Sequence, residues 1–251
     1  MSLTETDYKT RQSLLSIERL LYIGPWNHIE LTLNYNLQHV KEYIYIDTQP
    51  RSEDDKPFKF SRHFYRDEFM KNMVKKCNDF NFNLIELKTL DANYYKKLNL
   101  GIFEKIFYKT LYPDINPCLY VFKNNTTGVI LKYYISTNIK YNMTNELKND
   151  ITNSDALFVS GYYPDNEVLK YFNTPKSFIG ATNTIYRKDE DTDKSIIEYM
   201  LSNDTAKFDK IYMCTRHSNH MQLCDSFADM IDKCHKHPHE FAEGEEDEVD
   251  E

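Results

Sequence analysis

Glycine is scarce in this chain, with six glycines among 251 residues. Loops that cradle phosphates need several glycines at fixed spacing, and no Walker P-loop is present. The G-x-S-x-G and H-E-x-x-H motifs are also absent. A kinase, a serine hydrolase and a zincin are therefore disfavoured. The five cysteines are few, odd in number and dispersed, which predicts thiols rather than a disulfide framework.

Long hydrophobic runs are missing as well. No apolar stretch approaches the roughly 18 residues that a membrane helix requires. The first eleven residues are polar and do not have the basic start and apolar centre of a secretory signal. We therefore expect a soluble, cytoplasmic protein with no membrane attachment.

A surplus of positive charge is absent too. The net charge is −8, and residues 240–251 carry eight acidic and no basic side chains. Residues 1–239 are balanced, with 31 acidic and 31 basic side chains, which argues against general binding to a phosphate backbone. We expect 1–239 to form a single domain. We expect 240–251 to be a disordered acidic tail that solubilises the protein or contacts a basic partner.

The sequence does contain a clear strand–turn–helix–strand pattern near its start. The apolar run at 20–23 ends abruptly at Gly24 and Pro25, as a strand buried on both faces would. Apolar residues at helical spacing follow over 29–40, and a second strand is predicted at 43–47, ending in Asp47. This order and length are typical of a βαβ unit.

The same alternation continues along the chain. It indicates a doubly wound, mostly parallel sheet, which is a Rossmann-like, three-layer αβα architecture with an inserted β-hairpin. Further strands are predicted at 82–87, 156–161, 177–181 and 208–214, the hairpin at 119–135, and helices at 8–17, 66–77, 143–149, 167–172, 193–201 and 221–234.

Ligands of open α/β sheets bind beyond the carboxyl ends of the strands, so the residues that follow each strand are the candidates. Gly24 allows a tight turn and close approach of a ligand. Asp47 lies 23 residues later, near the spacing at which an acid binds the hydroxyls of a ribose. The alternative is that Gly24 is a turn glycine and Asp47 a capping residue.

The segment from Leu20 to Gly24, followed by Tyr45 to Asp47, resembles the first two strands of class I S-adenosylmethionine-dependent methyltransferases. The resemblance implies that the loop beginning at Gly24 and Pro25 wraps the methionine part of the cofactor. It also implies that Asp47 binds the ribose hydroxyls. S-adenosylmethionine is thus the expected cofactor.

The resemblance extends to two later positions. An acid after the third strand, matched here by Asp91, would lie near the adenine. Ser160 and Gly161, at the end of the fourth strand, would border the methyl group and the acceptor. The asparagine-rich composition and acidic tail also resemble proteins of giant DNA viruses.

The methyltransferase pattern is incomplete, which keeps alternatives open. The first loop carries one glycine rather than two or three, and the Asn/Asp-Pro-Pro-aromatic motif of amino-methylating enzymes is absent. The expected partner is a small molecule or a nucleotide-containing substrate, and the acceptor is unspecified. The alternatives are a catalytically inactive binding or structural module and a nucleotide- or sugar-modifying enzyme that uses the same cleft for a different nucleotide.

The C-terminal region holds side chains that zinc prefers, including Cys214, His217, His220 and Cys224. No Cys-x2-Cys pair is present. Cys214 ends a predicted buried strand, and Cys224 is predicted on the apolar face of a helix. We therefore assign no metal site. His28 as a base and Arg51 as an anion partner are weaker candidates than a packed histidine and a surface arginine.

Overall fold

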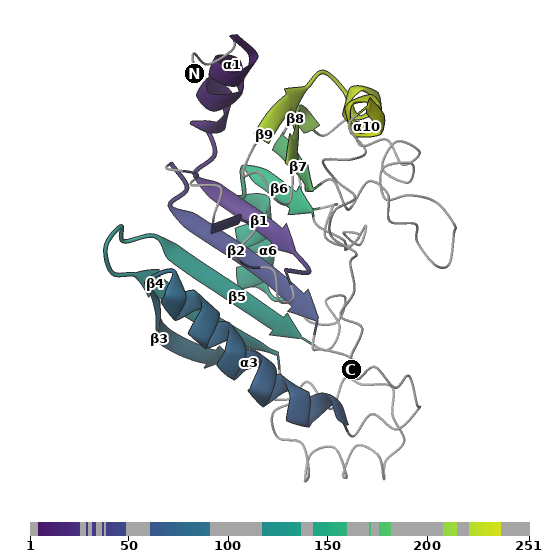
Figure 1. Ribbon diagram of the computed structural model, residues 1–251. Coiled ribbons are helices and arrows are strands. Elements are labelled where there is room, and N and C mark those ends of the chain that lie inside the picture. The colour runs from purple at the N-terminus through teal and green to yellow at the C-terminus, as the bar shows by residue number, and fades with distance from the viewer. Residues whose placement is uncertain are drawn as a thin grey trace, which may run out of the picture.

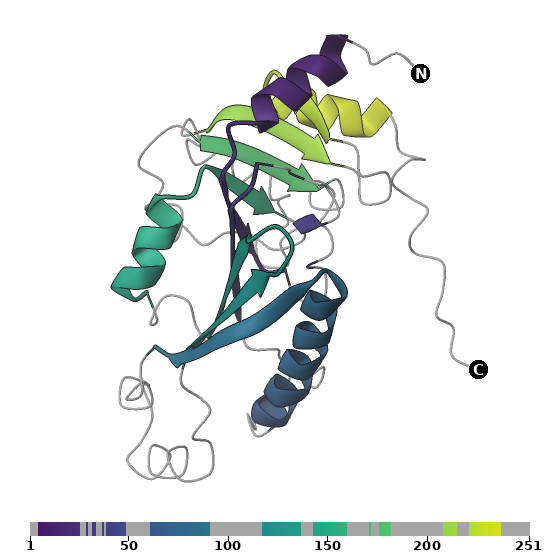
Figure 2. The ribbon, with the colours of Figure 1, turned by 90° about the vertical axis from the view of Figure 1, so that its left-hand side faces the viewer.

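A computed structural model describes the parts of the chain considered below. Within them, the strands form a single nine-stranded sheet, and helices pack on both of its faces (Figures 1 and 2). The described residues are 5–25, 29, 32–33, 37, 39–48, 61–90, 117–136, 143–159, 171, 176–181, 208–214 and 221–236.

Two apolar strands lie at the centre of the sheet, β1 (Arg19–Ile23) and β2 (Glu42–Thr48). They pair in parallel, as the predicted βαβ unit requires. On either side of them lie β5 (Ile130–Ser136) and β6 (Ala156–Val159), also in parallel. Beyond β6 come β7 (Lys176–Ala181) and β8 (Phe208–Cys214), in the same direction.

The order of strands across the whole sheet is β3-β4-β5-β2-β1-β6-β7-β8-β9. Counted by their appearance in the chain, the six adjacent parallel strands have the order 3-2-1-4-5-6. The chain therefore builds outward from β1 in one direction, through β2 to β5. It then returns to the other side of β1 with β6. This point of reversal lies between β1 and β6.

Three strands complete the edges: β3 (Phe82–Thr89), β4 (Cys118–Asn124) and β9 (Met221–Cys224). The predicted hairpin is confirmed as β4 and β5, which pair antiparallel. It is not an insertion, however, because β5 is the third strand of the parallel set and lies beside β2. Buried side chains on both faces of β5, such as Leu131 and Tyr134, suit it to this interior position.

The prediction of one helix over 221–234 was wrong for its first residues. Residues 221–224 form β9, which pairs antiparallel with β8, and α10 (Phe227–Lys236) begins after it. Ser226 caps this helix, since its hydroxyl accepts a hydrogen bond from the Asp229 amide at 3.1 Å. Cys224 therefore lies on a strand and not on a helix face. The backbone of β9 satisfies its hydrogen bonds by extending the sheet.

The helices divide between the two faces because neighbouring strand residues point in opposite directions. On one face, Met73 and Cys77 of α3 (Ser61–Asp79) pack over the sheet. On the other, Leu147 of α6 (Asn145–Thr152) and Met230 of α10 do so. Figure 2 shows α3 and α6 on opposite sides of the sheet.

The first helix, α1 (Glu5–Leu14), lies against β9. It begins and ends three residues before the predicted bounds of 8–17. Most of the helix predicted at 29–40, the helices at 167–172 and 193–201, and the tail at 240–251 lie outside the described residues. No helix in the described part of the chain combines the length and apolar character needed to cross a membrane.

Candidate ligand-binding site at the carboxyl edge of the sheet

The carboxyl ends of three central strands meet at one level. Ile23 of β1 pairs with Ile46 of β2 on one side and with Val159 of β6 on the other. Gly24 and Asp47 are the next residues along their strands, so they are neighbours at this edge. The place where the direction of winding reverses is where open α/β sheets bind their ligands.

The chain leaves β1 through a tight turn at Gly24. Its φ of 67° lies in the left-handed region, which glycine adopts without strain. Its amide donates a hydrogen bond to the carbonyl of Ile46 at 2.8 Å, which extends the contact with β2 by one residue. Pro25 follows and is buried.

Asp47 is a buried carboxylate, 2% exposed. Its Oδ2 accepts a hydrogen bond from the hydroxyl of Tyr133, on the adjacent strand β5, at 2.9 Å. The pKa of Tyr133 is well above its ordinary value, because of burial first and then the charge and hydrogen bond of Asp47. The hydroxyl therefore stays protonated and holds the carboxylate in one orientation.

A row of aromatic rings lies directly below this edge. Phe158, Tyr22, Tyr45 and Tyr133 come from the four adjacent strands β6, β1, β2 and β5, and all are fully buried. Their successive ring centroids are 4.7, 5.6 and 5.8 Å apart in edge-to-face contact, a favourable arrangement for aromatic pairs. Each ring lies two residues before the edge position of its strand. A continuous row of packed aromatic rings therefore lies next to the edge.

Thr32, in the connection between β1 and β2, contacts Tyr45 of this row of rings. The hydroxyl of Thr32 lies 2.5 Å from that of Tyr45, and Thr32 is completely buried. Burial raises the pKa of Tyr45 well above its ordinary value, so this phenol also remains neutral. The contact fastens the segment after the glycine turn to the second strand.

No protein-family model, curated protein or solved structure matches the chain.

The structure brings together three of the residues that the sequence singled out: Gly24, Pro25 and Asp47. Ser160 and Gly161 lie outside the described residues, as do Trp26, His28 and Arg51. Ser160 directly follows Val159, which pairs with Ile23. Its predicted role therefore stays a prediction.

Asp91 also lies outside the described residues, but the strand before it has a different place from the one expected. β3 is the outer strand of the sheet, separated from β2 by β4 and β5. Three strand spacings correspond to about 14 Å. The position beside β2 belongs to β5, whose last residues are Ile135 and Ser136. The third parallel strand therefore ends at these residues, and Asp91 does not follow it.

The cysteines of the described chain are buried. Cys77, Cys118, Cys214 and Cys224 are thiols, as the sequence predicted. Burial raises the pKa of Cys77 to about 12 and that of Cys224 to about 11, which opposes formation of a reactive thiolate. Among the residues described, no three His, Cys, Asp or Glu side chains are grouped as a metal site would require.

Sequence reasoning missed Tyr133 as a site residue. It fell within the predicted hairpin, and nothing local indicated that β5 would pair with β2. The available signal was the alternation of Leu131, Tyr133 and Ile135, which places Tyr133 on a buried face. Its partner became evident only from the register between the two strands.

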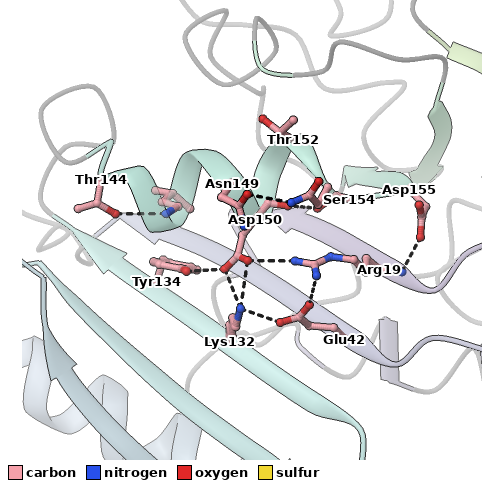
Figure 3. Close-up of polar contacts among 12 residues, drawn as sticks. Arg19, Glu42, Lys132, Tyr134, Thr144, Asn149, Asp150, Thr152, Ser154 and Asp155 are labelled. Carbon is pink, nitrogen blue, oxygen red and sulfur yellow. Dashed lines mark hydrogen bonds and ion pairs between the residues drawn. The ribbon is translucent and has the colours of Figure 1, made fainter.

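A second buried polar cluster lies on the opposite face, around Asp150 of α6 (Figure 3). Its carboxylate accepts hydrogen bonds from Arg19 at 3.0 Å, from Lys132 at 3.0 and 3.1 Å, and from Tyr134 at 2.5 Å. Glu42 pairs with the same two cations, at 2.7 and 2.8 Å. Two positive and two negative charges thus balance. This cluster fastens α6 across β1, β2 and β5.

Proposed function

We propose that this chain is a Rossmann-like protein that binds a nucleoside-containing ligand at the carboxyl edge of β1 and β2. S-adenosylmethionine is the first candidate ligand. One observation carries the proposal: the carboxylate of Asp47 is held by Tyr133 beside the glycine turn, where the winding of the sheet reverses.

The topology supports the proposal. The order 3-2-1-4-5-6 of six parallel strands is that of Rossmann dinucleotide-binding folds. Helices on both faces fit the three-layer arrangement of those folds. In them, the ligand lies across the reversal point and the acid after the second strand binds ribose.

The chemistry of the edge suits a ribose. Two neighbouring hydroxyls can donate to one carboxylate, and a carboxylate that is already oriented loses little entropy on binding. The tight turn at Gly24 lets the ligand approach the backbone. The buried aromatic rings beside Asp47 lower the local dielectric constant, which strengthens hydrogen bonds to its carboxylate.

With S-adenosylmethionine bound, the reaction would be methyl transfer. S-adenosylmethionine would supply an electrophilic methyl group for the lone pair of the acceptor, with a neutral thioether as the leaving group. The protein would act mainly by placing the acceptor in line with the methyl group, which is a proximity effect. The acceptor itself is left unspecified.

The burial of Asp47 favours a second candidate, a catalytically inactive binding or structural module. The carboxylate is 2% exposed, and one of its oxygens is already occupied by Tyr133. A buried, hydrogen-bonded pair such as Asp47 and Tyr133 can stabilise the fold without binding any ligand. The edge of the sheet would then contribute packing and not ligand binding.

Calorimetric titration with S-adenosylmethionine, S-adenosylhomocysteine and NAD separates these candidates. We expect micromolar binding of the first two ligands, reduced at least about tenfold in Asp47→Asn because a charged acceptor is lost. Glu146→Gln is the matched control, since it neutralises an exposed carboxylate on α6 at the opposite face.

Each outcome has one meaning. Binding of NAD alone would favour a different nucleotide-linked activity. No heat with any of the ligands, on protein shown to be folded by circular dichroism, would contradict the proposal and favour the inactive module.

A further inference from the structure

The outer strand β3 is unusually exposed for an apolar strand. Of its eight residues, Phe82 is buried and the other seven are exposed. Leu84 is 40% exposed, and Ile85 and Leu87 are each 57% exposed. The described part of the chain exposes four large apolar side chains, and three of them are on β3; the fourth is Leu15. Figure 2 looks onto this edge, with β3 in front.

An edge strand of this length offers a row of backbone groups for pairing with another chain. One side of β3 pairs with β4. Within the described part of the chain, no strand pairs with its other side. A bulge interrupts the ladder between Leu84 and Glu86, and regular pairing resumes from Glu86 to Thr89. The regular segment is the part suited to extending the sheet.

We propose that β3 pairs antiparallel with β3 of a second copy of this chain, about a two-fold axis at Leu87. In this register, Glu86 of each copy lies opposite Lys88 of the other, and the two Leu87 side chains face each other. Opposite charges in directly opposed positions stabilise antiparallel pairs, and so do facing apolar side chains. A two-fold contact of this kind closes on itself and does not extend into a fibre.

Charge fixes the register. An axis at Glu86 would place two carboxylates opposite each other, and an axis at Lys88 would place two ammonium groups opposite each other. An axis at Ile85 would place Leu84 opposite Glu86 and would lie on the bulge. Of these four axes, only the one at Leu87 places each charged side chain opposite a side chain of opposite charge.

The faces of the sheet agree with this register. Glu86 and Lys88 pair with Val121 and Leu119 of β4, whose side chains lie on the α6 face. Lys88 already contacts Glu146 of α6 at 2.6 Å, and it is 47% exposed. It can therefore reach a carboxylate of a second copy on the same face.

The contact is small, because it consists mainly of the regular part of one strand from each copy. Contacts at the low end of interface size are typical of transient complexes. We therefore expect a dimer with a dissociation constant of about 10–100 µM.

Sedimentation velocity across this concentration range tests the proposal. Glu86→Lys alone and Lys88→Glu alone should each weaken the dimer at least about tenfold, because like charges are then opposed. The double variant should restore dimerisation, since the opposed charges are again of opposite sign. Lys75→Glu, an exposed position on α3, should leave the dimer unchanged.

Hydrogen exchange of residues 82–89 supplies a second readout. Protection that rises with protein concentration is expected. A monomer at all concentrations, a double variant that stays monomeric while folded, or protection that does not depend on concentration would overturn the proposal. The last result would mean that another part of the same chain covers β3.

Discussion

The hydroxyl of Tyr133 donates a hydrogen bond to the carboxylate of Asp47 at 2.9 Å. The next residue, Tyr134, points to the opposite face and donates to Asp150 at 2.5 Å. Two consecutive tyrosines of β5 thus each hold one buried carboxylate, one at the candidate site and one in the cluster around Asp150. Their likeness makes each the natural control for the other.

Removing the hydroxyl of Tyr133 should weaken ligand binding, whereas removing that of Tyr134 should not. Tyr133→Phe and Tyr134→Phe each leave a buried carboxylate with one donor fewer, so each should lower the free energy of unfolding by about 1–3 kcal/mol. Tyr133→Phe should also weaken binding of S-adenosylhomocysteine about tenfold, because Asp47 loses its fixed orientation. Urea unfolding and calorimetry measure the two effects. Equal affinities in the two variants would contradict a positioning role for Tyr133.

The protein should lose stability steeply in alkaline solution. The pKa values of Tyr45, Tyr133 and Tyr134 are raised above the ordinary 10.0, chiefly by burial. The unfolded chain therefore releases these protons from pH 10 upward, while the folded chain retains them. Their contribution is fully present below pH 10 and falls above it by about 1.4 kcal/mol per pH unit for each tyrosine.

Urea unfolding at about pH 8, 9.5 and 10.5 measures this dependence. The thiols of Cys77 and Cys224, with pKa values raised from 9.0 to about 12 and about 11, begin the same effect one unit earlier. Tyr133→Phe should flatten the slope above pH 10. An unfolding free energy that is constant between pH 8 and 10.5 would contradict the burial of these phenols.

Neutralising Asp150 should destabilise the fold strongly. Asp150→Asn leaves the half-buried Arg19 and Lys132 with Glu42 as their remaining carboxylate in the cluster, so one positive charge is uncompensated. Breaking a buried ion pair in this way costs about 3–5 kcal/mol. Glu146→Gln, whose partner Lys88 is exposed, should change stability by less than about 1 kcal/mol. Thermal unfolding measures the loss of stability in Asp150→Asn and in Glu146→Gln. Similar losses would contradict a special contribution of the cluster around Asp150 to stability.

Gly180 should not tolerate a methyl group. A Cβ at this position would lie 2.9 Å from Cε1 of Phe178, whose ring is held between Phe208 and Phe227. Gly180→Ala should therefore lower the free energy of unfolding by about 1–3 kcal/mol through overpacking. Gly128→Ala is a useful comparison, because nothing lies within 4 Å there and its cost comes from the left-handed φ of 75° alone. Urea unfolding measures both, and a neutral Gly180→Ala would show that the ring can move.

Most strands could be predicted because each has its own apolar pattern. The eight strands from β1 to β8 all occur near their predicted residues. β9 was missed because its four residues lead directly into a helix, and a short apolar run does not distinguish the two. Its strand conformation comes from pairing with β8.

The candidate site was predictable in part. Gly24 follows one strand that the apolar pattern identifies and Asp47 lies near the end of the other, and both are at the carboxyl edge of the sheet. Asp91 was assigned to the third strand of the parallel set, but the strand before it, β3, is the outer strand and pairs antiparallel with β4. Tyr133 and the cluster around Asp150 have no local signal, because their partners are far away in the sequence.

The sequence by itself determined the α/β class, the first two strands with the turn at Gly24, and the position of Asp47 at the carboxyl end of the second strand. These features depend on hydrophobic periodicity and on turn residues, which are local properties. The tertiary structure decided which strand lies beside β2, that β3 occupies an exposed edge, and which tyrosine holds Asp47. These depend on strand order and register, which are set by the packing of the whole sheet.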